Sequence, residues 1–130
     1  MVITLQNQKG GVGKTTLSVH LAHGLTLRKR RVRLVDADKQ GSASDWAAAR
    51  EEAPLFSVIG MDRPTLRKEL PALAGDYQDV IIDGPPRIYE MARSAMLAAD
   101  IVLIPVTPSP YDVWAAEESV SLIKEAQIFK

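Results

Sequence analysis

Short apolar runs rich in β-branched residues alternate along the chain with longer segments whose apolar residues recur at helical spacing. The runs that predict strands are VITLQ (2–6), VRLVDAD (32–38), LFSVIG (55–60), DVIIDG (79–84) and DIVLIPV (100–106). Strands that alternate with helices form βαβ units. The pattern therefore predicts an α/β fold, with a parallel β-sheet flanked by helices on both faces.

The helical segments carry their own signals. Leu17, Leu21 and Leu25 recur at i, i+4 and i+8, which predicts a helix whose apolar stripe faces the sheet. Ser42 and Ser109 each begin an S-x-x-D pattern, typical of a capping box at a helix start. Pro110 fits the first position of the helix that begins after Ser109. These signals predict where two of the helices begin.

Length and composition fit one globular domain over residues 1–130, since 46% of the residues are hydrophobic and 25% are charged. We find no internal repeat and no linker. The pattern ends on a helical segment, where a doubly wound sheet normally continues. We therefore expect a single domain that is incomplete at its C-terminal side.

Charge and cysteine content exclude several classes of function. Sixteen basic residues balance sixteen acidic ones, so binding to nucleic acid would need a local patch. We expect the basic run RKRRVR (28–33) to serve helix capping and solvation rather than DNA binding. The absence of cysteine excludes disulfides and iron–sulfur clusters. Without a signal-peptide pattern or a long apolar run, the expected location is cytoplasmic, with no membrane partner.

The segment NQKGGVGKTT (7–16) carries the clearest chemistry. A strand followed by glycines and then by Lys-Thr at a helix start is typical of a phosphate-binding loop, because glycine lets backbone N–H groups approach phosphate oxygens. Lys14 would reach the β and γ phosphates, and the Thr15 hydroxyl would bind Mg²⁺. The residues predicted to bind the nucleotide are Gly10, Gly11, Val12, Gly13, Lys14, Thr15 and Thr16.

Three aspartates follow predicted strands. Asp83 ends an apolar run, so its carboxylate should emerge at the carboxyl edge of the sheet, where open α/β folds bind ligands. There it could contact Mg²⁺, directly or through water. Asp36 and Asp38 are two residues apart on an extended segment and should point the same way, either toward the metal or toward an attacking water.

The glycine loop departs from the strict G-x-x-x-x-G-K-[ST] pattern, because Gln8 stands at its first glycine. The remaining K-G-G-V-G-K-T resembles the deviant Walker A motif of the ParA/MinD family of ATPases, whose marker is the extra lysine at Lys9. Further stretches are similar in the same order. They are VRLVDADKQGSAS (32–44) to switch I, DVIIDGPPR (79–87) to Walker B and switch II, and ADIVLIPVTPSPYDVWAAEES (99–119) to the small ParF-like partition proteins.

The resemblance implies a P-loop NTPase that hydrolyses ATP with Mg²⁺ and serves DNA segregation in plasmid or chromosome partition. By it, Lys9, Lys14 and Asp38 are catalytic, with Lys9 reaching the nucleotide of the other subunit and Asp38 positioning the water. Thr15, Asp36 and Asp83 would hold the metal. The implied partners are a second copy in the ATP-bound state, nonspecific DNA and a ParB-like centromere-binding protein, with the ATP-bound dimer on the nucleoid.

Two alternatives remain open at this stage. A MinD-like membrane-positioning ATPase would need a C-terminal amphipathic helix, and a ligase like dethiobiotin synthetase would need a site for a carboxylated small molecule. The chain departs from the partition proteins at Lys39, where proline is usual, and at Gly84, where threonine is common. Arg87, after two prolines, could contact phosphate or a partner, or simply lie on the surface.

Overall fold

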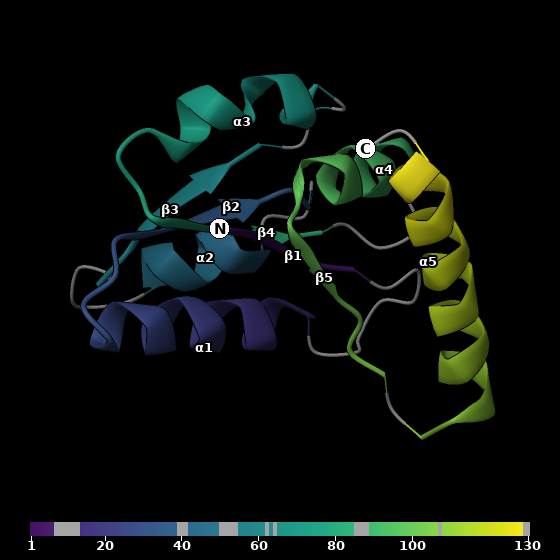
Figure 1. The fold of residues 1–130 in the computed structure, drawn as a ribbon. Helices are drawn as coiled ribbons and strands as arrows, with labels where there is room; N and C mark the ends of the chain where they lie inside the picture. Colours follow the sequence, from purple (N-terminus) through teal and green to yellow (C-terminus); the bar gives the residue numbers. More distant parts are fainter. Residues whose placement is uncertain are drawn as a thin grey trace.

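The computed structural model describes residues 1–6, 14–38, 42–49, 55–61, 63, 65–84, 89–106 and 108–128. Its centre is a five-stranded sheet in the order β3-β2-β4-β1-β5, and all of the strand pairs are parallel (Figure 1). The strands are β1 (Val2–Leu5), β2 (Val32–Asp36), β3 (Ser57–Gly60), β4 (Asp79–Asp83) and β5 (Ile101–Leu103). The predicted α/β fold with a parallel sheet is therefore confirmed.

Helices cover both faces of this sheet. In the view of Figure 1, α1 (Lys14–Leu27) and α2 (Ser42–Ala49) lie below the sheet, and α3 (Leu66–Ala74) and α4 (Tyr89–Ala98) lie above it. The last helix, α5 (Pro110–Ile128), packs against α4.

The apolar runs are continuous because the sheet is buried on both sides. Leu34 and Ile81 pack in the core below, with Val19 and Ala22 of α1. Successive side chains of a strand point to opposite faces, so the residues next to these in sequence belong to the core above the sheet. That core contains Val35, Val80 and Ile82 of the strands, together with Leu66, Leu70, Met91 and Ala95 of the helices.

The prediction that α1 turns an apolar stripe of three leucines toward the sheet is partly wrong. Leu21 and Leu25 pack at the margin of the core, but Leu17 is 47% exposed, and the helix buries Ser18 and Ala22 instead. Small side chains let the helix backbone lie close to the sheet. Leu17 instead faces a hollow of about 500 Å³ that is also lined by Leu103 and Pro105.

The strands are shorter than predicted, and the helix starts agree with the sequence. The last predicted strand stops at Leu103, two residues before Pro105, which has no N–H for a strand ladder. α2 begins at Ser42 and α5 at Pro110, although the side chains of both predicted capping aspartates lie outside the described residues. The Val113 N–H donates to the Ser109 carbonyl at 3.0 Å, as expected for a first helical turn.

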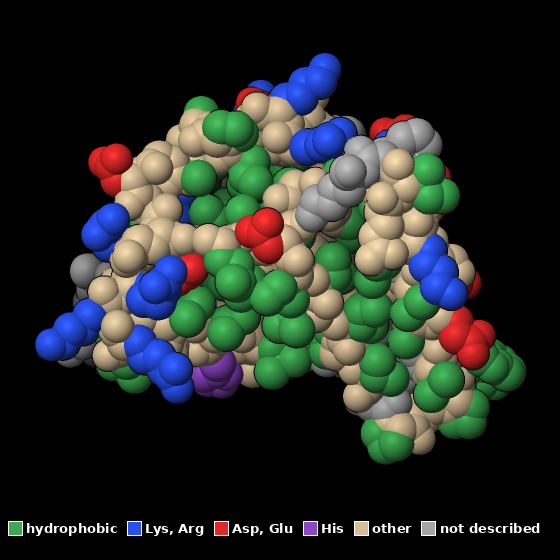
Figure 2. Space-filling view, in the orientation of Figure 1, with side chains coloured by type: hydrophobic (Ala, Val, Ile, Leu, Met, Phe, Trp, Pro, Cys, Tyr) green, Lys and Arg blue, Asp and Glu red, His purple; other side chains and the backbone are tan. Residues whose placement is uncertain are grey.

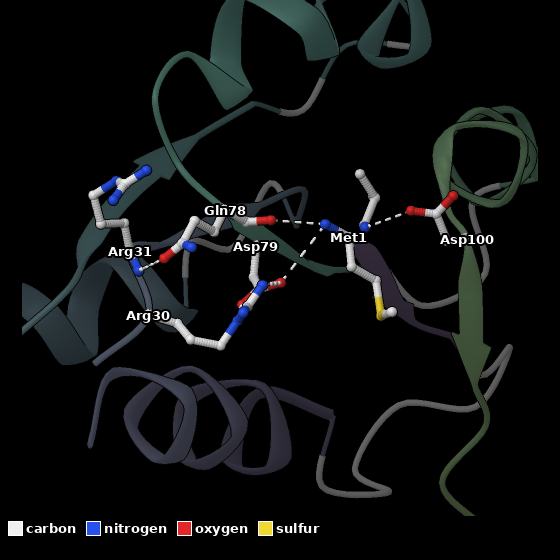
Figure 3. A network of polar contacts seen from close by, with 7 residues as sticks. Met1, Arg30, Arg31, Gln78, Asp79 and Asp100 are labelled. Carbon is white, nitrogen blue, oxygen red and sulfur yellow. Dashed lines mark hydrogen bonds and ion pairs between the residues drawn. The ribbon is translucent and has the colours of Figure 1, made fainter. Parts of the chain in front are cut away.

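The basic run, for which we expected helix capping and solvation, makes contacts with the start of β4 that the sequence did not predict. Arg30 pairs with the buried Asp79, with its Nη2 atom 3.0 Å from Oδ1, and the Met1 amino group lies 3.6 Å from the same carboxylate oxygen (Figure 3). The Arg31 backbone N–H donates to the side chain of Gln78. The run therefore joins the end of α1 to the start of β4.

The end of α1 has an uncommon backbone. Lys29 adopts a left-handed conformation with φ 63°, its N–H donates to the Thr26 carbonyl, and the Arg30 N–H donates to the Leu25 carbonyl. These two bonds form a Schellman motif, which usually has glycine at the position of Lys29.

Apolar side chains remain exposed along one side of the molecule. β5 pairs only with β1 within the described sheet, and its Ile101 and Leu103 are 40% and 41% exposed. Figure 2 shows hydrophobic side chains between β5 and α5 and at the lower end of α5. Tyr111 and Trp114 of α5 are exposed and pack edge to face, whereas Trp46 stacks on the buried Phe56. No helix among the described residues is long and apolar enough to cross a membrane.

Candidate functional site

The carboxyl edge of the central strands brings together two buried aspartates. Asp36 ends β2 and Asp83 ends β4, and the two are direct partners in the register of these strands. Each is only 1% exposed. The next strand, β1, pairs with β4 and leads into the glycine loop, so the edge predicted from Asp83 is the one that also receives the start of α1.

Two hydroxyl groups of α1 hold the Asp83 carboxylate. Thr15 Oγ1 donates to Oδ2 at 2.7 Å, and Ser18 Oγ lies 3.3 Å from Oδ1. The Thr15 contact joins two residues that the sequence selected for the same metal. Ser18 was missed, although it follows Thr15 by three residues and so shares its helix face.

Lys14 is the first residue of α1 and is 7% exposed. Burial lowers the pKa of its ammonium group, and the negative charges of Asp83 and Asp38 oppose this effect. The side chain therefore places a largely desolvated cation within electrostatic reach of both aspartates. Helix α1 adds the partial positive charge of its N-terminus at the same edge.

The Asp83 carboxylate is costly to ionise in this place. Burial raises its pKa to about 6, and the neighbouring charge of Asp36 acts in the same direction, while the hydrogen bond from Thr15 lowers the pKa. Two buried carboxylates side by side favour a bound cation.

The donor set fits Mg²⁺, which proteins usually bind through one or two carboxylates together with phosphate and water oxygens. Among the described residues no group of three or more acidic, histidine or cysteine side chains could hold a metal by itself. Thr15, Asp36 and Asp83 would therefore supply part of a coordination sphere that phosphate oxygens complete.

Asp38 lies just beyond the end of β2 and is half-buried. Its backbone N–H donates to Asp36 Oδ1 at 3.1 Å, so one oxygen of Asp36 supports the turn after the strand. The strand ends at Asp36, and the strand alternation on which we based a common direction for the two side chains therefore does not extend to Asp38.

The structure thus brings together Lys14, Thr15, Asp36 and Asp83, with Asp38 close by, and Thr16 is exposed at the start of α1. The remaining selected residues lie outside the described part of the chain. They are Lys9, Gly10, Gly11, Val12 and Gly13 of the loop, together with Lys39 and Arg87.

Comparisons with known proteins find a matching family, curated relatives and solved structures with a similar fold. Residues 3–126 match the family described as the CobQ/CobB/MinD/ParA nucleotide binding domain. The chain is 36% identical over 129 residues to the maintenance of carboxysome distribution protein A of Halothiobacillus neapolitanus, covering 96% of this chain and 59% of that protein. It is 29% identical over 167 residues to the chromosome partitioning protein ParA of Myxococcus xanthus, covering 95% of this chain and 59% of that protein. The chain therefore spans about three fifths of these relatives.

Solved structures share the fold. Cobyrinic acid a,c-diamide synthase from Mycobacterium smegmatis, with an ATP analogue and magnesium bound, has a TM-score of 0.83 at 24% identity, over 97% of this chain and 68% of that chain. The ParA of pNOB8 bound to nonspecific DNA has a TM-score of 0.73 at 22% identity, over 89% of this chain and 56% of that chain.

Proposed function

The chain belongs to the family of CobQ/CobB/MinD/ParA nucleotide-binding domains, and we propose from this that it binds ATP with Mg²⁺ at the carboxyl edge and hydrolyses it. One observation carries the proposal: the Thr15 hydroxyl lies 2.7 Å from the buried Asp83 carboxylate. That contact joins the first turn of α1 to the end of β4, at the edge where an open parallel sheet binds its ligand.

ATP binding would use the buried ammonium group of Lys14 and the hydroxyl group of Thr15. The phosphates would lie over the N-terminus of α1 and the backbone N–H groups of Gly10–Gly13, and Lys14 would offset their charge from within the protein. Thr15 and Asp83 would contact the metal, and Asp36 would support it from the neighbouring strand. Bound Mg²⁺ offsets further phosphate charge, which grows as the γ-phosphoryl group leaves.

For the hydrolysis step we assign two further residues. Asp38, at the end of the same edge, would orient the attacking water. Lys9 would add a positive charge at the phosphates of a second subunit, so that hydrolysis requires an ATP-bound dimer. Both assignments rest on the family resemblance of the motifs that contain these residues.

At the level of the cell we propose a ParA-type cycle that serves DNA segregation. An ADP-bound monomer would become an ATP-bound dimer that binds DNA nonspecifically, and a ParB-like partner would stimulate hydrolysis and release the dimer. The relative named ParA and the fold shared with a DNA-bound ParA support this reading.

A second candidate function is the positioning of a protein compartment, because a relative at 36% identity is named for the distribution of carboxysomes. The same ATP cycle could position a protein compartment along DNA. The two functions share the nucleotide site and differ in the partner that stimulates hydrolysis. Stimulation by a DNA–ParB-like complex supports segregation, whereas stimulation only by a compartment-bound protein supports distribution.

The two lysines offer a sharp test of the ATP cycle. Lys14→Ala should weaken Mg·ATP binding itself, because its charge acts on the nucleotide of its own subunit. Lys9→Ala should keep nucleotide affinity within about 3-fold of the parent chain, yet lose ATP-dependent dimerisation and hydrolysis together. Nucleotide titration and light scattering measure both, and Lys124→Ala on the exposed side of α5 is a matched control. Normal dimerisation and hydrolysis by Lys9→Ala would overturn the proposed role of Lys9.

A further inference from the structure

Gly84 lies where β4 ends and is the last described residue before segment 85–88. It is buried, and its N–H donates to the Leu5 carbonyl at 3.1 Å, which extends the pairing of β4 with β1 by one residue. A Cβ atom at this position would fall 2.3 Å from Gln6 Nε2 and 2.4 Å from Gln6 Cδ and Oε1. The carboxamide of Gln6 therefore fills the space that a side chain at position 84 would need.

This contact gives the departure at Gly84 a physical reason. A threonine here would collide with a side chain that is itself enclosed, since Gln6 is 1% exposed. The glycine is needed for the close approach of the carboxamide, and its φ is not in the left-handed region. Gln6 and Gly84 thus act as a matched pair across two neighbouring strands.

A buried chain of hydrogen bonds fixes the Gln6 carboxamide. Gln6 Nε2 donates to Thr4 Oγ1 at 2.9 Å, and the Thr4 hydroxyl donates to the Ile82 carbonyl at 3.3 Å. The single hydroxyl proton of Thr4 is used on Ile82, so Thr4 can only accept from the amide, which fixes the orientation of the Gln6 carboxamide. Its Oε1 atom has no hydrogen-bond donor among the residues that the structure describes.

The position of Gln6 along the chain connects this pair to the candidate site. Gln6 follows β1 directly, its N–H donates to the Leu103 carbonyl at 2.9 Å, and the glycine loop begins with the next residue. On the other face of the sheet, Asp83 accepts a hydrogen bond from Thr15 and lies 3.3 Å from Ser18 Oγ. The backbone at residues 83–84 is therefore held from one face by α1 and from the other by Gln6.

We propose that Gln6 is a positioning residue for hydrolysis, which fixes Gly84, and with it the Asp83 end of β4, relative to the end of β1. This inference rests on the ATP hydrolysis proposed above. The buried carboxamide does not touch the nucleotide. It holds two segments of the site in one register, and a displacement of about 1 Å in such a site lowers turnover by about 10²-fold.

The test separates position from stability. Gln6→Met keeps the length of the side chain but removes both hydrogen-bonding groups. We expect its Tm to stay within about 5 °C of the parent value. Its nucleotide affinity should stay within about 3-fold, whereas kcat should fall by about 10- to 100-fold. Gln127→Met, on the exposed end of α5, is the matched control and should leave Tm, KM and kcat unchanged.

The steric part of the inference has its own readout. Gly84→Ala alone should lower Tm, and adding Gln6→Ala should restore Tm without restoring kcat, because the space is regained but the carboxamide is lost. A parent-like kcat in Gln6→Met, or in the double variant if Gln6→Met fails to fold, would overturn the positioning role. An unchanged Tm in Gly84→Ala would overturn the steric pair. Absence of ATP turnover in the parent chain would refute the proposed function, while the Tm cycle would still test the pair.

Discussion

Replacing Asp83 with asparagine should stabilise the nucleotide-free protein while abolishing Mg²⁺-dependent ATP binding. In the fold the pKa of Asp83 is about 6, against an ordinary value of 3.8. Keeping this carboxylate ionised at pH 8 therefore costs the folded state about 3 kcal/mol, since each pKa unit corresponds to about 1.4 kcal/mol. A neutral amide of the same shape avoids that cost.

The hydrogen bonds of the site can survive the exchange. Thr15 can still donate to the amide oxygen. Ser18 already donates to the Lys14 carbonyl at 2.7 Å, so its hydroxyl oxygen can accept from the amide nitrogen. Lys14, however, loses a nearby negative charge, so we expect a net gain of about 1–2 kcal/mol in the free energy of unfolding.

Urea unfolding at pH 8 without nucleotide measures this gain, and Asp76→Asn, at an exposed residue, is the control. The cost of ionising Asp83 can also be measured from the pH dependence of the free energy of unfolding. Because the pKa is raised in the fold, the contribution of Asp83 to stability falls as pH rises from about 4 to 6, and the asparagine variant should lack this fall. A variant less stable than the parent by 1 kcal/mol or more, on the order of one lost hydrogen bond to a charged group, would refute the reasoning.

Three further predictions follow from other parts of the chain. The hydrogen bonds from Arg30 lower the pKa of Asp79, so its stabilising contribution is present above about pH 3.8 and is lost as pH falls through the folded pKa; Asp79→Asn should remove this loss in acid unfolding followed by circular dichroism. Lys29→Gly should raise the free energy of unfolding by about 0.5–1 kcal/mol, because the residue has φ 63°, whereas Lys29→Ala should give no gain in the same urea measurement. Asp38→Ala should keep ATP binding nearly intact and lower hydrolysis by about 10² or more, and equal turnover in variant and parent would return Asp38 to a structural role supporting the turn after β2.

The sequence was informative where local pattern decides structure. The β-branched runs predicted all five strands of the described sheet, because strands buried on both faces need continuous apolar residues. Asp83 and Thr15 were selected from two separate motifs, and the parallel sheet brings both to one edge. Glycine loops and strand-end aspartates can be predicted because the residues that carry their chemistry are consecutive in the sequence.

Contacts that depend on packing between distant segments could not be predicted. The burial of Ser18 and the exposure of Leu17 depend on how closely α1 approaches the sheet and on the hollow beside β5. The match between Gln6 and Gly84 joins residues 78 positions apart and depends on side-chain geometry that no local pattern contains. The strand bounds also differ from the predicted runs, since β3 begins two residues later and β5 ends three residues earlier than predicted.

The most direct test of the account is a titration of the chain with a fluorescent ATP analogue, with and without Mg²⁺. The account predicts saturable binding that requires Mg²⁺ and that Thr15→Ala weakens by about 10-fold or more, because the hydroxyl that lies 2.7 Å from Asp83 is lost. Thr26→Ala, in the last turn of the same helix and away from the edge, should bind like the parent chain. No saturable binding up to about millimolar nucleotide, or binding that is the same without Mg²⁺ and in Thr15→Ala, would contradict the assignment of this edge as the ATP site.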